Sequence, residues 1–191
     1  PTMLIYDEDH PAPFNLFRCV GVDFDKYQAS SSIIVLDYIP EFKCFKVVKR
    51  VELPKTEYSY DAAFNAILSV NRIYNPAWIY CDRGSGEYIL ERLHIYGKEH
   101  PETGLHNKVK GWQFANTLDI EDPVTHEMQK KPMKPFMVNQ LSIAFERHRM
   151  VLSPFDELVS KQLIDYRVER IGKNNQPVFC SENEHFVDAL G

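Results

Sequence analysis

The sequence predicts a mixed α/β fold, in which an antiparallel three-strand meander continues into parallel strands with helices on both faces of the sheet. Apolar strand patterns separated by short turns fill residues 16–53. A helical pattern then leads into another short apolar strand, and helices alternate with strands over the rest of the chain. The chain has 191 residues, of which 44% are hydrophobic, which is enough for one domain with a sizeable core.

The first strands are recognised as runs of apolar residues between turn residues. They are expected at residues 16–23, 32–39 and 42–53. Because only short turns separate them, neighbouring strands must pair antiparallel. Residues 1–15 are polar and proline-bearing, and we expect them to form a linker or arm.

The first helix is expected over residues 58–74, where apolar residues recur at helical spacing. Ser59 or Asp61 is suited to cap its start, and Asn75-Pro76 marks its end. The apolar residues 78–82 then form a strand. Since a strand, a helix and a second strand make a crossover unit, this strand should run parallel to an earlier one.

The second half of the chain contains a long segment that differs from its surroundings. Residues 97–135 are rich in glycine, proline and lysine, and are expected to be a loop or a β-hairpin insertion. Helices are expected at 87–96, 136–148 and 154–164, a strand at 150–152, a hairpin at 166–180 and a last helix from Glu182 or Asn183.

Three aspartates far apart in the sequence stand at the edges of short apolar segments. Asp23 follows Cys19-Val20-Gly21-Val22, Asp82 follows Trp78-Ile79-Tyr80-Cys81, and Asp188 follows His185-Phe186-Val187. If the fold brings these ends together, they form an all-oxygen site suited to Mg²⁺ or Mn²⁺. Paired ions on carboxylates are typical of enzymes that cut phosphodiesters, so the pattern indicates a nuclease.

Two further residues are candidates for accessory roles. Asp25 can join the metal site through a water, or can cap a turn. His185 lies three residues before Asp188, so on a helix both share a face. His185 is therefore either a residue that orients Asp188 or contacts phosphate, or a structural histidine.

The cysteines and the net charge restrict the class of protein. Four cysteines are present without a CxxC pair, which argues against a zinc site and favours reduced, buried thiols in the cytoplasm. The net charge of -5 is not typical of a free-standing DNA-binding protein, so other components are expected to help hold a nucleic acid. No apolar run is long enough to span a membrane.

The local wording around the three acids resembles the acidic motifs of the nuclease domain of phage large terminases, which has the RNase H-like fold. The motifs are Val20-Gly21-Val22-Asp23-Phe24-Asp25-Lys26, Asp82-Arg83-Gly84-Ser85-Gly86 and Glu184-His185-Phe186-Val187-Asp188-Ala189-Leu190. Residues 131–139 stand where that family has a loop before a helix. The resemblance covers residues 16–191 and implies an RNase H-like nuclease domain over this range.

The resemblance implies metal-dependent cleavage of double-stranded DNA with little sequence specificity, which cuts a concatemeric viral genome in the host cell cytoplasm. Asp23, Asp82 and Asp188 would bind two Mg²⁺ or Mn²⁺ ions as the catalytic site. No G-x-x-x-x-G-K-[ST] phosphate loop is present. We therefore expect the chain to be the nuclease half of a large subunit whose partners are an N-terminal packaging ATPase domain, the portal and the small terminase subunit.

Basic residues near the second motif and in the 97–135 segment are candidates for contact with the DNA backbone. They are Arg83, Lys108, Lys110, Lys130, Lys131 and Lys134. Arg83 is equally suited to pair with a neighbouring acid. Acidic residues in the same segment nearly cancel the lysines, so docking on the motor or the portal is the alternative.

Two classes of alternative function stay open at this point. A Holliday-junction resolvase or a ribonuclease H would use the same acids on a different substrate. A docking module of the same fold would be non-catalytic, and the presence of all three acids argues against it. An actin-like ATPase would need a phosphate loop, which the sequence does not contain.

Overall fold

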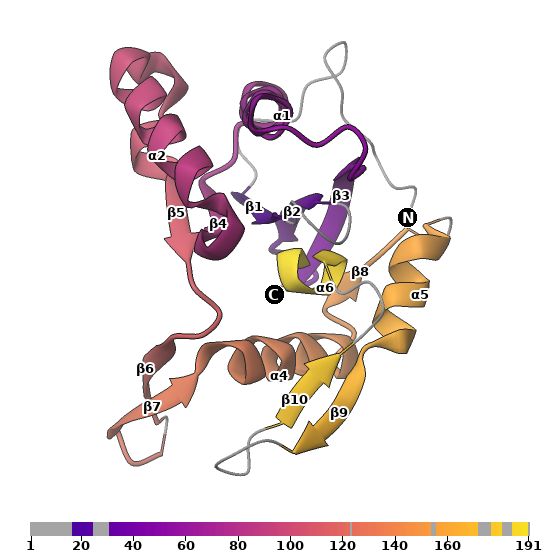
Figure 1. The fold of residues 1–191 in the computed structure, drawn as a ribbon. Helices are drawn as coiled ribbons and strands as arrows, with labels where there is room; N and C mark the ends of the chain where they lie inside the picture. Colours follow the sequence, from indigo (N-terminus) through magenta and orange to yellow (C-terminus); the bar gives the residue numbers. More distant parts are fainter. Residues whose placement is uncertain are drawn as a thin grey trace.

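A six-stranded mixed sheet forms the centre of the protein in a computed structural model, which describes residues 17–24, 31–122, 124–153, 156–171, 177–180 and 185–190 (Figure 1). The strand order is β5-β4-β1-β2-β3-β8. Antiparallel and parallel pairs both occur in it, and helices lie on both of its faces, which confirms the predicted fold class.

The predicted meander is the first part of this sheet. It consists of β1 (Phe17–Asp23), β2 (Ser31–Ile39) and β3 (Cys44–Leu53). β2 pairs antiparallel with both neighbours, with Asp23 opposite Ser32 and Ser31 opposite Leu53. The strands alternate between two apolar faces, so the meander is buried on both sides.

The predicted crossover follows the meander. α1 (Tyr60–Tyr74) begins at Ser59, whose hydroxyl accepts a hydrogen bond from the Ala62 amide at 3.0 Å. It ends at Asn75, which adopts the left-handed conformation with φ of 42°. β4 (Trp78–Asp82) then returns beside β1 and runs parallel to it, as predicted.

The segment after β4 contains more regular structure than the sequence indicated. α2 (Arg83–Glu99) begins directly after Asp82 and is longer than the predicted helix at 87–96. A 3₁₀ turn and a short helix follow, η1 (Pro101–Thr103) and α3 (Leu105–Lys108), and then β5 (Val109–Trp112). β5 joins the main sheet parallel to β4 and was not predicted. A separate hairpin follows, formed by β6 (Thr117–Glu121) and β7 (Met128–Pro132).

The remaining elements agree in type with the prediction. They are α4 (Met133–Glu146), β8 (Met150–Val151), α5 (Glu157–Asp165), β9 (Arg167–Ile171), β10 (Pro177–Cys180) and α6 (His185–Leu190). β8 pairs parallel with β3 at the edge of the sheet, and β9 pairs antiparallel with β10.

Two apolar clusters hold the helices against the sheet. On one face, β1 and β2 side chains such as Val20 and Ile33 pack with Ile67 of α1 and Leu93 of α2. On the other face, Ile34 packs with residues of α5 and α6. Figure 1 shows α1 and α6 on opposite sides of the sheet, with α4 lying beyond α6. Among the described residues, no helix has the length and apolar character needed to cross a membrane.

A buried ion pair joins the start of β1 to β2 and to the end of α1. Arg18 and Asp37 are opposite each other in the sheet and are 1% and 3% exposed. Arg18 donates two hydrogen bonds to the Asp37 carboxylate and one to the Tyr74 carbonyl oxygen, with distances of 2.5 to 2.7 Å. A buried charge requires such a partner, because it has lost its hydration.

α6 rests on the backbone of β1 at Gly21. A Cβ atom at Gly21 would clash with the carbonyl oxygen and carbon of Ala189. These are backbone atoms of a helix, so they cannot rotate away as the end of a flexible side chain can. Glycine at this position therefore sets how closely the C-terminal helix approaches the central strand.

Replacing Asp37 with Ala should strongly destabilise the protein, because it removes the carboxylate that the buried Arg18 guanidinium binds. We expect the free energy of unfolding, measured by urea titration, to fall by about 3 to 5 kcal/mol. The matched control is Asp61→Ala, which removes the mainly exposed partner of Arg92 and should cost less than about 1 kcal/mol. Equal effects of the two substitutions would contradict the structural role of the buried pair.

Replacing Gly21 with Ala should displace α6 from β1. The added methyl group overpacks the contact with Ala189, which typically costs about 1 to 3 kcal/mol. Native-state hydrogen exchange should therefore show faster exchange of the α6 amides, while the α1 amides serve as an internal control. Unchanged protection of α6 would show that the helix does not depend on this contact.

Candidate metal centre at the ends of β1 and β4

Asp23 and Asp82 occupy matching positions at the ends of neighbouring parallel strands. The register pairs Gly21 with Tyr80 and Val22 with Cys81, so the next position on each strand is an aspartate. Side chains alternate along a strand, and Asp23 therefore faces the same side as Gly21, which is the side covered by α6. The parallel register thus places both carboxylates at one edge and on one face of the sheet.

The two aspartates differ in their exposure and local role. Asp23 is 6% exposed. Asp82 is half-buried and immediately precedes α2, where an aspartate commonly caps the helix. Its side chain, however, accepts no capping hydrogen bond from α2. The Asp82 side chain therefore does not cap α2.

Asp188 reaches the same region from the C-terminal helix. It lies in α6 next to Ala189, whose backbone rests on Gly21. Its side chain is 11% exposed. Asp82 and Asp188 both line one pocket, so the fold brings together the second and third predicted acids although they are far apart in the sequence.

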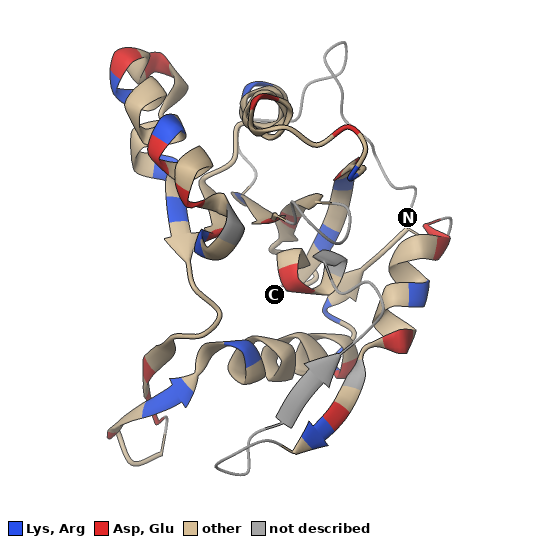
Figure 2. Cartoon of the chain, viewed as in Figure 1, with Lys and Arg blue, Asp and Glu red and all other residues tan. Residues whose placement is uncertain are grey.

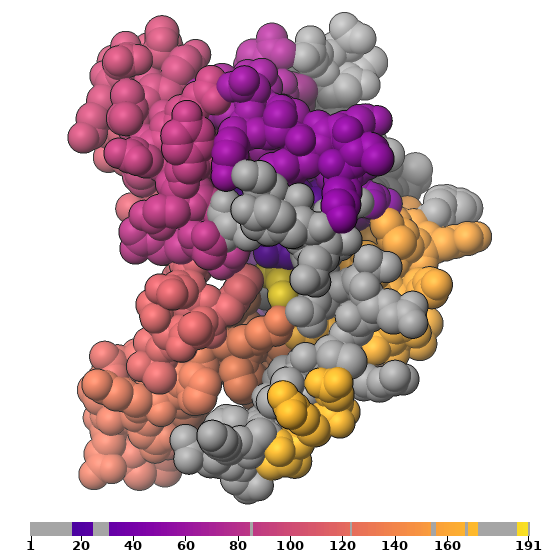
Figure 3. Space-filling model, in the orientation of Figure 1, coloured from indigo at the N-terminus to yellow at the C-terminus, as the bar shows by residue number. Residues whose placement is uncertain are grey.

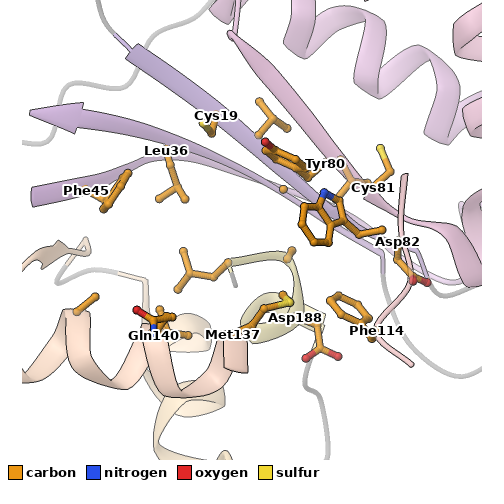
Figure 4. A pocket seen from close by; sticks show the side chains of 18 of the residues that line it. Cys19, Leu36, Phe45, Tyr80, Cys81, Asp82, Phe114, Met137, Gln140 and Asp188 are labelled. Atoms are coloured by element: carbon orange, nitrogen blue, oxygen red, sulfur yellow. The ribbon is translucent and has the colours of Figure 1, made fainter. Parts of the chain in front are cut away.

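The pocket has a volume of about 400 Å³ and lies between the sheet and α4. Its walls are mainly apolar and aromatic, and they include Cys19, Leu36, Phe45, Tyr80, Trp112, Phe114, Phe136 and Met137. Figure 4 shows Asp82 and Asp188 toward one end of it together with Phe114, and Phe45 and Leu36 toward the other. The molecular surface is hollowed between α2 and the β6–β7 hairpin, with α6 visible inside the hollow (Figure 3).

The donor set suits a hard divalent cation, since three carboxylates supply only oxygen ligands. Asp82 and Asp188 open into the pocket, and Asp23 ends the strand beside Asp82. Within the described ranges, no three Asp, Glu, His or Cys side chains are grouped closely enough to hold one ion. The chemistry of the residues therefore fits a metal site, while the side chains do not converge on a single point in this conformation.

The Asp188 carboxylate instead forms an ion pair with a lysine. Lys134 Nζ lies 2.9 Å from Asp188 Oδ2, and the lysine side chain is 26% exposed. Lys134 is in the first turn of α4, and its ammonium lies 5.9 Å from the centre of the Phe114 ring. A residue that the sequence analysis assigned to DNA contact thus contacts one of the candidate metal ligands.

Two accessory candidates fall wholly or partly outside the described residues. Asp25 is outside them. His185 begins α6, three residues before Asp188, but its side chain is outside what the structure describes.

The other basic candidates lie in three different settings. Arg83 donates two hydrogen bonds of 2.9 Å to Glu87, and this contact lowers the pKa of Glu87. Lys108 donates a hydrogen bond of 2.7 Å to the Asn75 side chain, and partial burial lowers the pKa of Lys108. The Lys110 ammonium lies over the Trp78 ring, 5.1 Å from its centre.

Lys130 and Lys131 are exposed on β7 of the projecting hairpin, which Figure 2 shows in blue. Lys130 is paired with Asp119 across the hairpin and Lys131 with Leu118. The hairpin therefore presents lysines beside acidic residues, as the mixed composition of the segment indicated.

The thiols near the site are not activated. Burial raises the pKa of Cys81 well above its ordinary range, and the neighbouring Asp82 carboxylate raises it further. Burial also raises the pKa of Cys19, which lines the pocket. Cys19, Cys44 and Cys81 are free thiols, as predicted, and the Cys180 side chain is outside the described part of the chain.

Sequence reasoning missed the role of one glycine and one contact that shape this site. Gly21 was part of a quoted motif but had no assigned role, although a glycine inside a strand pattern often marks a close backbone approach. The contact of Lys134 with Asp188 had no signal in the sequence, because the two residues are 54 positions apart in unrelated elements.

Comparison with known proteins gives matches among solved structures. No protein-family model and no curated protein matches the sequence. The large terminase nuclease from thermophilic phage G20c with bound magnesium matches with a TM-score of 0.68 and 16% identity, over 98% of this chain and 88% of that one.

Two further structures match over similar lengths. The Thermus phage P74-26 large terminase nuclease domain has a TM-score of 0.61 and 15% identity, over 98% of this chain and 87% of that one. The large terminase nuclease domain of bacteriophage SPP1 with bound Mn has a TM-score of 0.59 and 16% identity, over 100% of this chain and 90% of that one. The chain therefore has the RNase H-like fold of phage large terminase nuclease domains, as its three acidic motifs indicated.

Proposed function

We propose that this chain is a metal-dependent endonuclease that cuts double-stranded DNA with little sequence specificity, and that it serves as the nuclease part of a viral DNA-packaging terminase. One observation carries the proposal. Asp82 and Asp188 line one pocket and Asp23 ends the strand beside Asp82, in a fold shared with large terminase nucleases. The relatives with bound magnesium and with bound Mn support the use of such ions.

Asp23, Asp82 and Asp188 are the residues proposed to hold two Mg²⁺ or Mn²⁺ ions. Such ions, when bound, would supply activation of water and stabilisation of the charge on the phosphate. The chain contributes the position of the carboxylates. Asp23 and Asp82 are set by the parallel register of β1 and β4, and Asp188 is set by the seat of α6 on Gly21.

The pocket beside these acids has mainly apolar walls. Tyr80 and Trp112 pack edge to face at 5.7 Å, and Phe114 lies next to Asp82 and Asp188 in the pocket lining. Apolar walls lower the local dielectric, which strengthens the interaction of carboxylates with cations. The arrangement places charged groups at one end of the pocket and apolar side chains at the other.

The proposed DNA contacts are weak by themselves, which suits a domain that acts within a larger machine. The net charge of -5 opposes binding to phosphates. Lys130 and Lys131, which are exposed on the hairpin, are the basic residues that we propose contact DNA. The match to the HK97 bacteriophage large terminase covers 94% of this chain and 39% of that one, with a TM-score of 0.62. This match supports the proposal that the chain is one part of a longer protein. The ATPase domain, the portal, the small subunit and the host cytoplasm are the proposed setting of that protein, on the resemblance of the three acidic motifs.

Cleavage of supercoiled plasmid should require Mg²⁺ or Mn²⁺ and should stop in EDTA. Replacing Asp82 with Asn removes a charged ligand, so we expect a loss larger than the ~10–100-fold typical of residues around metal ligands. The control is Asp165→Asn, an exposed acid on α5 with the same change in charge, which should cut normally. Gel analysis of the products measures each rate.

The same assay separates the proposed function from its alternatives. Preference for branched DNA over linear duplex would indicate a junction resolvase, and preference for an RNA–DNA hybrid would indicate a ribonuclease H. Absence of cutting by the wild type on every substrate, at high protein concentration and with both metals, would favour a docking module.

Replacing Lys130 and Lys131 together with Ala should weaken binding to duplex DNA and flatten its salt dependence. The slope of log K against log salt is negative, and each lost phosphate contact should reduce its magnitude by about 0.9. Fluorescence anisotropy in EDTA measures binding without cleavage. The matched control replaces Lys98 and Lys161, which are exposed on α2 and α5, and should have a smaller effect. Equal effects would remove the hairpin from the proposed DNA surface.

A further inference from the structure

The contact between Lys134 and Asp188 has the features of a built ion pair. The Nζ–Oδ2 distance is 2.9 Å, and the exposed fractions of the two side chains are 26% and 11%. For comparison, the pair of Arg83 with Glu87 is 52% and 60% exposed. A carboxylate that is largely removed from water needs a compensating charge or donors, and Lys134 supplies a charge.

The position of Lys134 is set by the start of α4. The neighbouring Met133 is 4% exposed, and its amide donates a hydrogen bond of 2.9 Å to the Asn116 carbonyl oxygen at the base of the hairpin. The lysine ammonium also lies 5.9 Å from the centre of the Phe114 ring, within the range of a cation–π contact. The anchored backbone and the ring contact together hold this lysine beside Asp188, which lines the pocket.

We propose that Lys134 is an internal counter-ion of Asp188 that competes with the divalent metal for this carboxylate. The inference rests on the proposed function, because it takes Asp188 to be a metal ligand. A cation bound to the same carboxylate and the Lys134 ammonium repel each other at short range, beside a pocket whose walls are mostly apolar. Metal binding therefore has to displace or withdraw the ammonium.

This role makes Lys134 a positioning residue that sets how much metal the site requires. Its ion pair holds the half-buried Asp188 carboxylate in one orientation. The cost is a lower metal affinity, since part of the binding energy breaks the pair. Lys134 thus differs from Lys130 and Lys131, which are exposed on β7, because its Nζ lies 2.9 Å from Asp188 Oδ2.

Direct titration with Mn²⁺ tests the proposal without any cleavage. Isothermal titration calorimetry on the wild type and on Lys134→Met should show tighter binding to the variant, by about 10-fold or more. Because a ligand that binds the native state stabilises it, Mn²⁺ should also raise the melting temperature of the variant more than that of the wild type.

Three control variants separate charge competition from other effects. Lys134→Arg keeps the positive charge and should bind Mn²⁺ much as the wild type does. Lys98→Met removes an exposed lysine of α2 and should leave the affinity unchanged. In an Asp188→Asn background, the further change Lys134→Met should have no additional effect on Mn²⁺ affinity, because the shared carboxylate is gone.

The outcomes distinguish failure of this inference from failure of the proposed function. Equal Mn²⁺ affinity of wild type and Lys134→Met would overturn the inference and leave the metal site intact. Weaker binding to Lys134→Met would also overturn it, since the lysine would then assist the metal. Absence of Mn²⁺ binding to both proteins, and to Lys134→Arg, would overturn the metal site itself and the inference with it.

Discussion

The direct contact of α6 with β1 at Gly21 is the constraint on which the site depends. β1 lies in the middle of the sheet, between β4 and β2, and it carries Asp23 at its end. Asp188 reaches the same region only because the backbone of α6 can rest on the strand where no side chain intervenes. Because Gly21 has no side chain, the first and last acidic motifs lie close together. The same close approach brings Ala189 and Leu190 into the apolar cluster on that face of the sheet.

The opposite end of β1 is held by a different kind of interaction. The buried pair of Arg18 and Asp37 joins β1 to β2, and the same guanidinium binds the Tyr74 carbonyl oxygen at the end of α1. This contact orients the chain where it turns into β4, and the Ala77 amide donates to the Arg18 carbonyl oxygen at 2.8 Å. The parallel register that places Asp82 beside Asp23 is therefore supported by a charged anchor remote from the pocket.

Asp82 and Asp188 line the acidic end of the pocket, Asp23 ends the strand beside Asp82, and Lys134 of α4 pairs with Asp188. Balance of charge is a requirement here, because Asp23 and Asp188 are largely removed from water. A bound cation and the Lys134 ammonium are two ways to satisfy the same need. The apolar walls formed by the sheet and α4 make the interaction of Asp188 with either cation stronger than it would be at an exposed surface.

The amino-acid sequence by itself determined the meander, the crossover and the location of Asp23 and Asp82 at strand ends, because these features depend on local periodicity and on turn length. It did not indicate β5, since four residues with a glycine among them carry too short a pattern and gain their stability from pairing with β4. Only the tertiary structure decided that Asp82 and Asp188 share a pocket and that Lys134 binds Asp188. Such contacts depend on how distant elements pack, and neither hydrophobic spacing nor charge along the chain records that packing.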